Sequence, residues 1–185
     1  MRCAAPVAPV RAAPADDAEQ VTQLVQGEPV RVAGCDGDWV WIVTAYDYPG
    51  WVRSGELDDG DGALPPPEGR APLEIAFGYL GTPYLWGGMT EAGIDCSGLV
   101  HMAYRRAGTV VPRDAWQQQD AGEPVADPEA GDLVFYAHPG KQADHVAFWL
   151  GGGRILHATG RDGLGVVEED EPDALRARRA GFVRF

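Results

Sequence analysis

The pattern of hydrophobic and polar positions divides the chain into two parts. In the first part, short apolar runs at residues 30–32, 39–43 and 48–52 are separated by turns rich in glycine, aspartate and proline. Short strands joined by such turns, with aromatic residues among them, are typical of a small barrel. We therefore predict a small all-β domain over residues 1–57.

The second part begins with helical patterns and ends with strand patterns. Residues 72–80 look helical, and in residues 96–107 the apolar positions recur at helical spacing behind Asp95, a suitable N-cap. Another short helix is expected to start near Asp114. Strands are predicted at residues 132–137, 144–150, 154–159 and 163–168, with a last one near 181–185. Helices followed by an antiparallel sheet predict an α+β layout for residues 71–185.

Residues 58–70 separate the two parts and have the composition of a linker. They contain polar turn residues, then a stiff run of three prolines, and they show no periodicity. The acidic start of the segment lacks the ligand spacing and the closing glutamate of a calcium loop. We interpret the segment as a linker.

The charge balance of the chain is strongly acidic. Among 185 residues, 28 acidic and 15 basic side chains give a formal net charge of -13. Such a chain repels phosphate backbones, and no basic patch offsets this, so no nucleic-acid partner is expected. The sequence has no apolar run of about 18 residues, so no membrane span is expected. The first residues do not have the pattern of a secretory leader, which favours a cytoplasmic location. Nothing in the sequence indicates an oligomeric state.

The three cysteines differ in their surroundings. An odd number without regular spacing argues against a disulfide framework, and Cys3 and Cys35 are expected to be small buried residues. Cys96 lies at the predicted start of a helix, where unpaired N–H groups and the helix dipole favour a thiolate and a lowered pKa. Cys96 is therefore a candidate nucleophile, and its alternative interpretation is a buried structural cysteine.

His145 is the candidate base for such a nucleophile. It begins an alternating run in which Val146 and the next alternate residues form a core face, so His145 lies on the other face. Three glycines at 151–153 then indicate a hairpin. A three-residue loop would place His145 diagonal to His157, within side-chain reach, whereas a two-residue loop would put the two histidines on opposite faces. If His157 orients His145 as a catalytic base, both histidines must lie on the same face, so we predict the three-residue loop.

A zinc site is the alternative interpretation of the same side chains. Cys96, His145 and His157, with His138 as a further ligand, match no common zinc spacing, so neither a metal nor another cofactor is expected. His101 is predicted to lie on the polar side of its helix and to be exposed.

Six short segments in order resemble a known family. They are PYLWGG at 83–88, DCSGLV at 95–100, PRD at 112–114, GDLVF at 131–135, HVA at 145–147 and HA at 157–158. Residues 72–185 thereby resemble the NlpC-type cell-wall cysteine endopeptidases, which have a papain-like core.

The resemblance implies hydrolysis of peptidoglycan stem peptides between D-glutamate and a diamino acid, such as meso-diaminopimelate or lysine. It implies Cys96 as nucleophile, His145 as base and His157 as the third, orienting residue. Tyr84 matches the family tyrosine near the oxyanion, where its hydroxyl would add to the backbone N–H of Cys96. The alternative interpretation of Tyr84 and Trp86 is that both are core aromatics, and it is the favoured one for Trp86.

The N-terminal segment resembles the bacterial SH3-like barrel that precedes some of these catalytic domains. The likeness lies in residues 7–14, 19–24 and 48–52. It is closest to a subgroup that removes L-Ala-γ-D-Glu from peptides with a free N-terminal L-alanine. In that subgroup the barrel closes one end of the cleft, and an acid and a tyrosine from it hold the ammonium group.

The same resemblance suggests substrate-binding residues. Tyr48 matches the tyrosine, and Glu19 is the first choice for the acid, with Glu28 as the second. Asp95 and Ser97 would assist at the same end of the cleft.

The free carboxylate of D-glutamate also needs a partner. Arg113, or the N–H groups at the helix start near Asp114, would receive it, and the alternative for these two residues is a helix cap with a surface ion pair. Ala115 and Asp144 stand where some relatives carry other polar residues.

The favoured hypothesis is a cysteine peptidase that cuts the γ-D-glutamyl–diamino acid bond of stem peptides with a free amino terminus, in cell-wall recycling. Three alternatives remain open. They are a general endopeptidase on intact peptidoglycan, a non-catalytic wall-binding protein, and an acyltransferase or amidase that uses the same cysteine and histidine.

Overall fold

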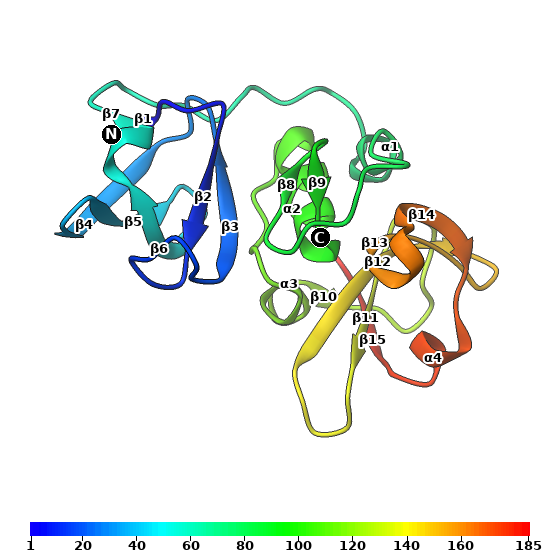
Figure 1. Ribbon diagram of the computed structural model, residues 1–185. Coiled ribbons are helices and arrows are strands. Elements are labelled where there is room, and N and C mark those ends of the chain that lie inside the picture. The colour runs from blue at the N-terminus through cyan, green and yellow to red at the C-terminus, as the bar shows by residue number, and fades with distance from the viewer. The chain divides into compact units, whose positions relative to one another are not determined.

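Antiparallel strands make up half of residues 1–66 in the computed structural model, which describes residues 1–185 (Figure 1). They are β1 (Arg2–Cys3), β2 (Val7–Arg11), β3 (Gln20–Val25), β4 (Val30–Asp36), β5 (Trp39–Thr44), β6 (Pro49–Arg53) and β7 (Leu57–Asp58). Five of them form one sheet in the order β3-β2-β6-β5-β4, and β1 pairs with β7. The first unit is thus the all-β domain that the sequence predicts.

One hydrophobic cluster fills this first unit. Its buried members are Cys3, Ala8, Val10, Leu24, Val30, Val40, Ile42, Val52 and Leu57. Gly50 permits the close approach of β6 to β2, because a Cβ atom there would lie 2.4 Å from Val10 Cγ1 and 3.1 Å from the Arg11 carbonyl oxygen. A larger side chain at this position would separate the two strands.

The sequence pattern indicates β4, β5 and β6 but not β2. Pro9 lies in the middle of β2 and has no N–H to donate, which weakens the strand signal. The prediction that Cys35 is buried is wrong, because most residues of β4 face solvent and Cys35 is exposed. Cys3 is buried as predicted.

The second unit comprises residues 67–85 and 90–185, and residues 86–89 belong to the first unit. Within the first unit, the side chain of Gln20 donates to the carbonyl oxygen of Trp86 at 2.8 Å, and the Met89 N–H donates to Gln23 Oε1 at 2.9 Å. The interpretation of Trp86 as a core aromatic is wrong. The residue is 59% exposed, and its indole N–H donates to Glu19 at 2.8 Å.

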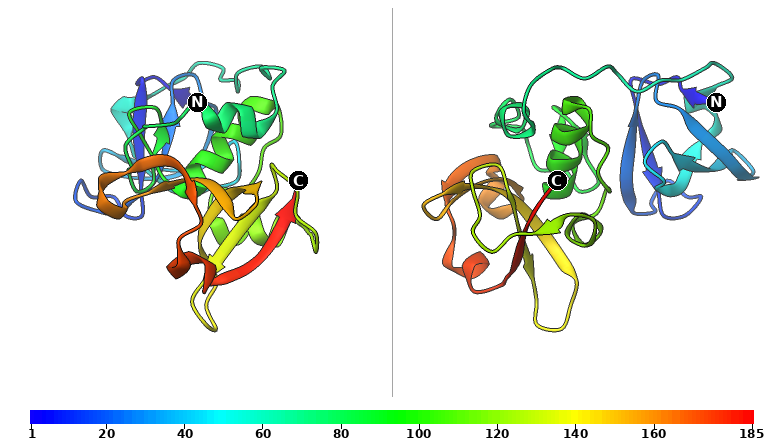
Figure 2. Two further views of the ribbon diagram at one scale, coloured as in Figure 1. Left: turned by 90° about the vertical axis from the view of Figure 1, so that its right-hand side faces the viewer. Right: turned by 180° about the vertical axis from the view of Figure 1, so that it is seen from behind.

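A six-stranded antiparallel sheet forms the main layer of the second unit. The helices are α1 (Pro72–Phe77), α2 (Cys96–Ala107), α3 (Ala115–Ala121) and α4 (Asp173–Arg176). The strands are β8 (Met89–Thr90), β9 (Gly93–Ile94), β10 (Glu123–Pro124), β11 (Leu133–Ala137), β12 (Ala143–Gly151), β13 (Arg154–Thr159), β14 (Gly165–Asp170) and β15 (Arg179–Arg184). The sheet order is β10-β15-β11-β12-β13-β14, and Figure 2 shows β15 in red beside the central strands.

Both faces of this sheet are covered near its centre. Phe148 of β12 stacks on Tyr104 of α2 with ring centroids 6.2 Å apart, so one face receives the helix. The other face carries a buried cluster of Val134, Tyr136, Ala147, Trp149 and Ile155. This double coverage fixes β12 firmly between α2 and the second cluster.

The hairpin between β12 and β13 has the predicted register but not the predicted loop. Trp149 pairs with Ile155, which places His145 diagonal to His157 as expected. The turn itself is different, because Gly151 pairs with Arg154 and the register shifts between Trp149 and Gly151. The turn is therefore a two-residue loop, and the irregularity at Leu150 restores the register that a three-residue loop would have given.

The remaining element boundaries agree with the sequence to different degrees. Helix α2 and strand β13 match their predicted ranges, whereas α1 ends at Phe77, before the predicted residue 80. Strand β14 starts at Gly165 because the short 3₁₀ turn η2 (Arg161–Gly163) occupies the preceding residues. No helix of the structure has the length and apolar character needed to cross a membrane.

His101 is fully buried, so the prediction of an exposed side chain is wrong. Almost every residue of α2 is buried, which leaves this helix without a solvent-facing side near its middle. His101 Nδ1 lies 2.7 Å from the carbonyl oxygen of Val111, so the imidazole ties α2 to the segment that precedes α3.

Burial of His101 predicts a loss of stability in acid. Burial lowers the pKa of His101 from 6.5 to about 3, so between these values the unfolded chain binds a proton that the folded chain does not. The contribution of the buried, uncharged imidazole to the free energy of unfolding is complete above pH 6.5 and is lost as the pH falls. It amounts to about 2 kcal/mol between pH 6.5 and pH 5.

His101→Asn, whose amide can still donate to Val111, should therefore show a smaller difference in unfolding free energy between pH 7.5 and pH 5 than the parent protein. Urea unfolding at both pH values measures this difference, and the exposed His138→Asn is the matched control. An unchanged pH dependence in His101→Asn would contradict the assignment.

Candidate active site

Cys96 is the first residue of α2 and is held there by a well-formed helix cap. Asp95 has an extended backbone, and its carboxylate accepts a hydrogen bond from the Gly98 N–H at 2.6 Å. Cys96 is 7% exposed, at the end of the helix where the backbone N–H groups point outward. The helix start predicted from the sequence is thus present.

Arg113 is directed at this helix start rather than at solvent. Its guanidinium binds both carboxylate oxygens of Asp95, at 3.0 and 2.7 Å, and donates to Ser97 Oγ at 2.8 Å. Arg113 is 1% exposed. The ion pair of Arg113 is therefore buried, not at the surface as the alternative interpretation had it, and contact of Arg113 with a substrate carboxylate stays a prediction.

The other predicted ligands near Arg113 also have structural partners. Ser97 Oγ lies 3.3 Å from Asp95 Oδ1, and both residues are buried. Asp114 is the N-cap of α3, and its N–H donates to the side chain of Gln117 at 3.2 Å. Contact of Asp95, Ser97 or Asp114 with a substrate stays a prediction.

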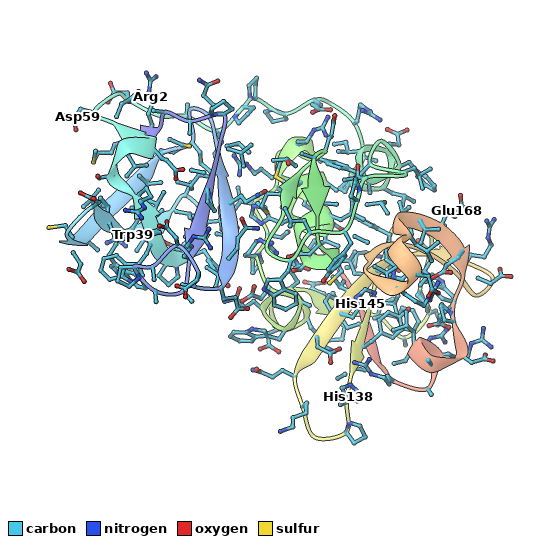
Figure 3. All side chains as sticks on the ribbon, in the orientation of Figure 1. Arg2, Trp39, Asp59, His138, His145 and Glu168 are labelled. Carbon is cyan, nitrogen blue, oxygen red and sulfur yellow. The ribbon has the colours of Figure 1, made fainter.

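The two candidate histidines form a direct hydrogen bond. His145 Nε2 and His157 Nδ1 are 2.7 Å apart, and the rings meet edge to face with centroids 5.0 Å apart. His145 is half-buried on β12, where Figure 3 labels it, and it also contacts the ring of Tyr136. The diagonal register of β12 and β13 therefore brings the predicted base and orienter together.

A carboxylate that the sequence analysis missed continues this chain. Glu169 Oε1 lies 2.9 Å from His157 Nε2, and Arg161 binds both Glu169 oxygens at 2.7 and 2.5 Å. His157 pairs with Val167, so Glu169 is two residues further along β14 on the same face. The period-two rule applied to the strand after His157 would have found it.

The thiol lies against β12 at the position of His145. The backbone of Val146, the residue after His145, is close enough to the Cys96 thiol to favour its charged form and to oppose the rise of its pKa. Since His145 Nε2 is taken by His157, its Nδ1 is the nitrogen left for proton exchange with the thiol. In an acyl transfer, Cys96 would be the nucleophile and His145 the base, with His157 and Glu169 behind the base.

Burial dominates the protonation of both reacting groups. It raises the pKa of Cys96 to about 12, assisted by the nearby Asp95 carboxylate and opposed by the Val146 N–H and Arg113. Burial also lowers the pKa of His145 to about 3, with further contributions from His157, Arg178 and Arg161. The expectation of a lowered thiol pKa is therefore wrong, because it considered the helix start but not the loss of solvent.

The two groups consequently share one proton across the neutral pH range. Neither charged form is favoured alone, but transfer of the thiol proton to the imidazole would create opposite charges that stabilise each other. Burial thus disfavours an isolated thiolate or an isolated imidazolium, and it favours transfer of the proton between Cys96 and His145.

Tyr84 belongs to the same neighbourhood. It bridges to Ile94, just before the helix start, and it is half-buried. Burial raises the pKa of Tyr84, and the Cys96 thiol is the next largest cause, so the phenol lies within electrostatic range of the nucleophile. A protonated phenol in this place can donate a hydrogen bond to a developing oxyanion.

The zinc alternative has no ligand set in the structure. No three side chains of histidine, cysteine, aspartate or glutamate gather around a common point. His138 is exposed near the loop between β11 and β12, whereas His145 lies further along β12 (Figure 3).

The remaining predicted residues belong to the first unit. Glu19 is exposed and accepts the hydrogen bond from Trp86, and Tyr48 is half-buried with its ring 6.3 Å from that of Tyr46. Glu28 is 1% exposed, and its carboxylate accepts from the Val25 N–H at 3.2 Å. This burial removes Glu28, the second choice, as a ligand for an ammonium group.

Two curated relatives are similar to part of the chain, and both are gamma-D-glutamyl-L-lysine dipeptidyl-peptidases. That of Bacillus subtilis (strain 168) is 46% identical over 84 residues, which are 43% of this chain and 28% of the relative. That of Bacillus cereus is 34% identical over 114 residues, which are 58% of this chain and 34% of the relative. The matches thus cover about a third or less of these relatives' lengths.

A solved structure shares the fold of the whole chain. The crystal structure of an NlpC/P60 family protein from Bacillus cereus superposes with a TM-score of 0.60 at 24% identity, covering 100% of this chain and 62% of the other. Residues 10–57 match the bacterial dipeptidyl-peptidase SH3 domain. Residues 81–176, more than half of the chain, contain Cys96, His145 and His157 and match the NlpC/P60 family, to which this chain therefore belongs.

Proposed function

We propose that the protein is a cysteine peptidase that hydrolyses the γ-D-glutamyl–diamino acid bond of peptidoglycan stem peptides. The observation that carries the proposal is the hydrogen-bonded series from His145 through His157 to Glu169, next to the buried thiol of Cys96 at a helix start. A merely structural cysteine does not need a base that is itself oriented by two further groups.

The site supports a two-step acyl transfer. Cys96 Sγ attacks the γ-carbonyl carbon of D-glutamate while its proton moves to His145 Nδ1. The oxyanion accepts hydrogen bonds from the Cys96 N–H and the Tyr84 hydroxyl, and His145 then gives the proton to the leaving amine. A water molecule, deprotonated by His145, attacks the resulting thioester and releases the glutamyl product with the free thiol.

The substrate class is supported by the relatives rather than by a bound ligand. Two relatives carry names that state cleavage after γ-D-glutamate and release of a dipeptide, and the SH3 domain at residues 10–57 is of the dipeptidyl-peptidase type. Release of a dipeptide requires a free amino terminus two residues before the cut. We therefore extend the proposal to stem peptides that begin with L-alanine, as in cell-wall recycling.

Glu19 and Tyr48 are proposed as the partners of that amino group. Glu19 carries an exposed carboxylate, one oxygen of which accepts from Trp86. An anionic acceptor is what an ammonium group requires when it leaves water. Glu19→Gln should therefore raise KM for the amino-free substrate more than it lowers kcat.

Cleavage of defined peptides tests the proposed reaction. The protein should release L-Ala-γ-D-Glu from L-Ala-γ-D-Glu-meso-diaminopimelate or from its L-lysine analogue, measured by chromatography with mass detection. Cys96→Ala should abolish release, and Cys35→Ala, an exposed cysteine outside the site, is the matched control.

Three other outcomes would redirect the assignment. Cleavage of only the N-acetylated peptide or intact sacculi would remove the requirement for a free amino group but retain the endopeptidase. Binding to sacculi without cleavage would indicate a non-catalytic wall-binding protein. Acylation of Cys96 by an acyl-chain probe without peptide cleavage would indicate an acyltransferase.

Removing the base should cost more activity than removing the residue behind it. His145→Ala removes the group that transfers the proton, so kcat should fall by about four orders of magnitude. His157→Ala removes only the orientation of that group, so kcat should fall by about two orders of magnitude. Steady-state rates with the peptide above measure both. A larger loss in His157→Ala would exchange the two roles.

The proton shared by Cys96 and His145 predicts a broad pH optimum. The Cys96–His145 pair holds one exchangeable proton at every pH between the low pKa of His145, about 3, and the high pKa of Cys96, about 12. Loss of activity requires a second proton in acid or removal of the last one in base, so kcat should change less than about threefold between pH 6 and pH 8. A bell-shaped profile with both limbs inside this range would refute the shared-proton account.

A further inference from the structure

Glu169 ends a chain of hydrogen bonds that leads to the candidate base. Its carboxylate meets His157 Nε2 at 2.9 Å, and His157 Nδ1 meets His145 Nε2 at 2.7 Å. The distances give the positions of the heavy atoms. The ionisation state of the Glu169 carboxylate then determines which nitrogen of each imidazole carries a proton.

An ionised carboxylate accepts hydrogen bonds and donates none. Burial opposes ionisation of Glu169, but the hydrogen bonds from Arg161 and His157 prevail and lower its pKa below the usual value. His157 must therefore carry its proton on Nε2 to meet Glu169. Its Nδ1 then holds a lone pair, so His145 must donate from Nε2, and His145 Nδ1 is left unprotonated.

The two other proton arrangements are unfavourable. The reversed arrangement would place the lone pair of His157 Nε2 against a carboxylate oxygen at 2.9 Å, with no proton between them. A doubly protonated His157 would place a cation on a side chain that is 1% exposed, and Arg161 already supplies the positive charge that Glu169 requires.

We propose that Glu169 is a positioning residue that selects the base tautomer of His145 through His157, with Arg161 holding the carboxylate in its accepting form. The kinetic consequence rests on the proposed function, but the tautomers themselves do not. Because the Glu169 carboxylate only accepts, it determines the tautomer of His157 and, through it, that of His145. The lone pair of His145 Nδ1 is thereby available for the Cys96 proton.

The strand register supplies a matched control next to Glu169. Glu168 pairs with Leu156 and so projects from the opposite face of β14, where it forms an ion pair with Arg154 at 2.8 Å. Figure 3 shows Glu168 away from His145. Glu168→Gln changes the same charge on the same strand without touching His157.

Imidazole ¹⁵N NMR of the wild-type protein tests the proposal without a variant, because protonated and unprotonated ring nitrogens have distinct shifts. We expect protonated Nε2 and unprotonated Nδ1 on both His145 and His157 near pH 7. The opposite tautomer on either ring would overturn the proposal. This readout stands even if no stem peptide is cleaved, a result that would defeat the proposed function alone.

Glu169→Gln then tests the origin of the tautomers. A glutamine amide both donates and accepts, so it no longer enforces one arrangement, and the His145 signals should shift toward a mixture. With a cleavable stem peptide, kcat should fall by about 10- to 100-fold with KM nearly unchanged, as is typical for partners behind a reacting residue. Glu169→Ala should shift the signals in the same sense, and Glu168→Gln should leave signals and kcat unchanged.

Two results would contradict the role of Glu169. One is a folded Glu169→Gln, judged by its melting temperature, that retains the wild-type imidazole shifts and kcat. The other is an equal loss of kcat in Glu168→Gln and Glu169→Gln, which would indicate a general effect of charge rather than a proton arrangement.

Discussion

The register between β12 and β13 is the constraint on which the active-site arrangement depends. Side chains alternate between the two faces of a strand, so a slip of one residue would move His157 away from His145. The hairpin avoids that slip by combining a two-residue loop with an irregularity at Leu150. Gly151, Gly152 and Gly153 all have positive φ values, which residues with side chains rarely adopt, so the triple glycine makes this turn possible.

Arginine–carboxylate pairs occur at both ends of the reacting groups. Arg113 neutralises Asp95 beside the nucleophile, and Arg161 neutralises Glu169 behind the histidines. Each carboxylate has a structural task, because Asp95 caps α2 and Glu169 accepts from His157. Without Arg113, Asp95 would place an uncompensated negative charge near a thiol that must itself become an anion. Without Arg161, Glu169 would lose the charge partner that helps to keep its carboxylate ionised. The two ion pairs therefore allow polar anchoring in a buried site.

The sequence predicted the local features of the site better than its tertiary features. The helix start at Cys96 and the diagonal relation of the histidines follow from short-range rules of capping and alternation, and both were confirmed. Glu169 was missed although the same alternation applied to β14. The burial of Arg113 and His101 was not predictable in this way, because it depends on how α2 packs against distant segments. The thiol pKa was misjudged for the same reason.

Reaction of Cys96 with an electrophilic substrate mimic tests the central claim most directly. L-Ala-γ-D-Glu with a diazomethyl ketone in place of the scissile amide presents the attacked carbonyl to the nucleophile. The account predicts one covalent adduct, located on Cys96 by peptide mass spectrometry, slowed by stem peptide and strongly reduced in His145→Ala. Labelling of Cys35 instead, or Cys96 labelling that neither stem peptide nor His145→Ala affects, would contradict it.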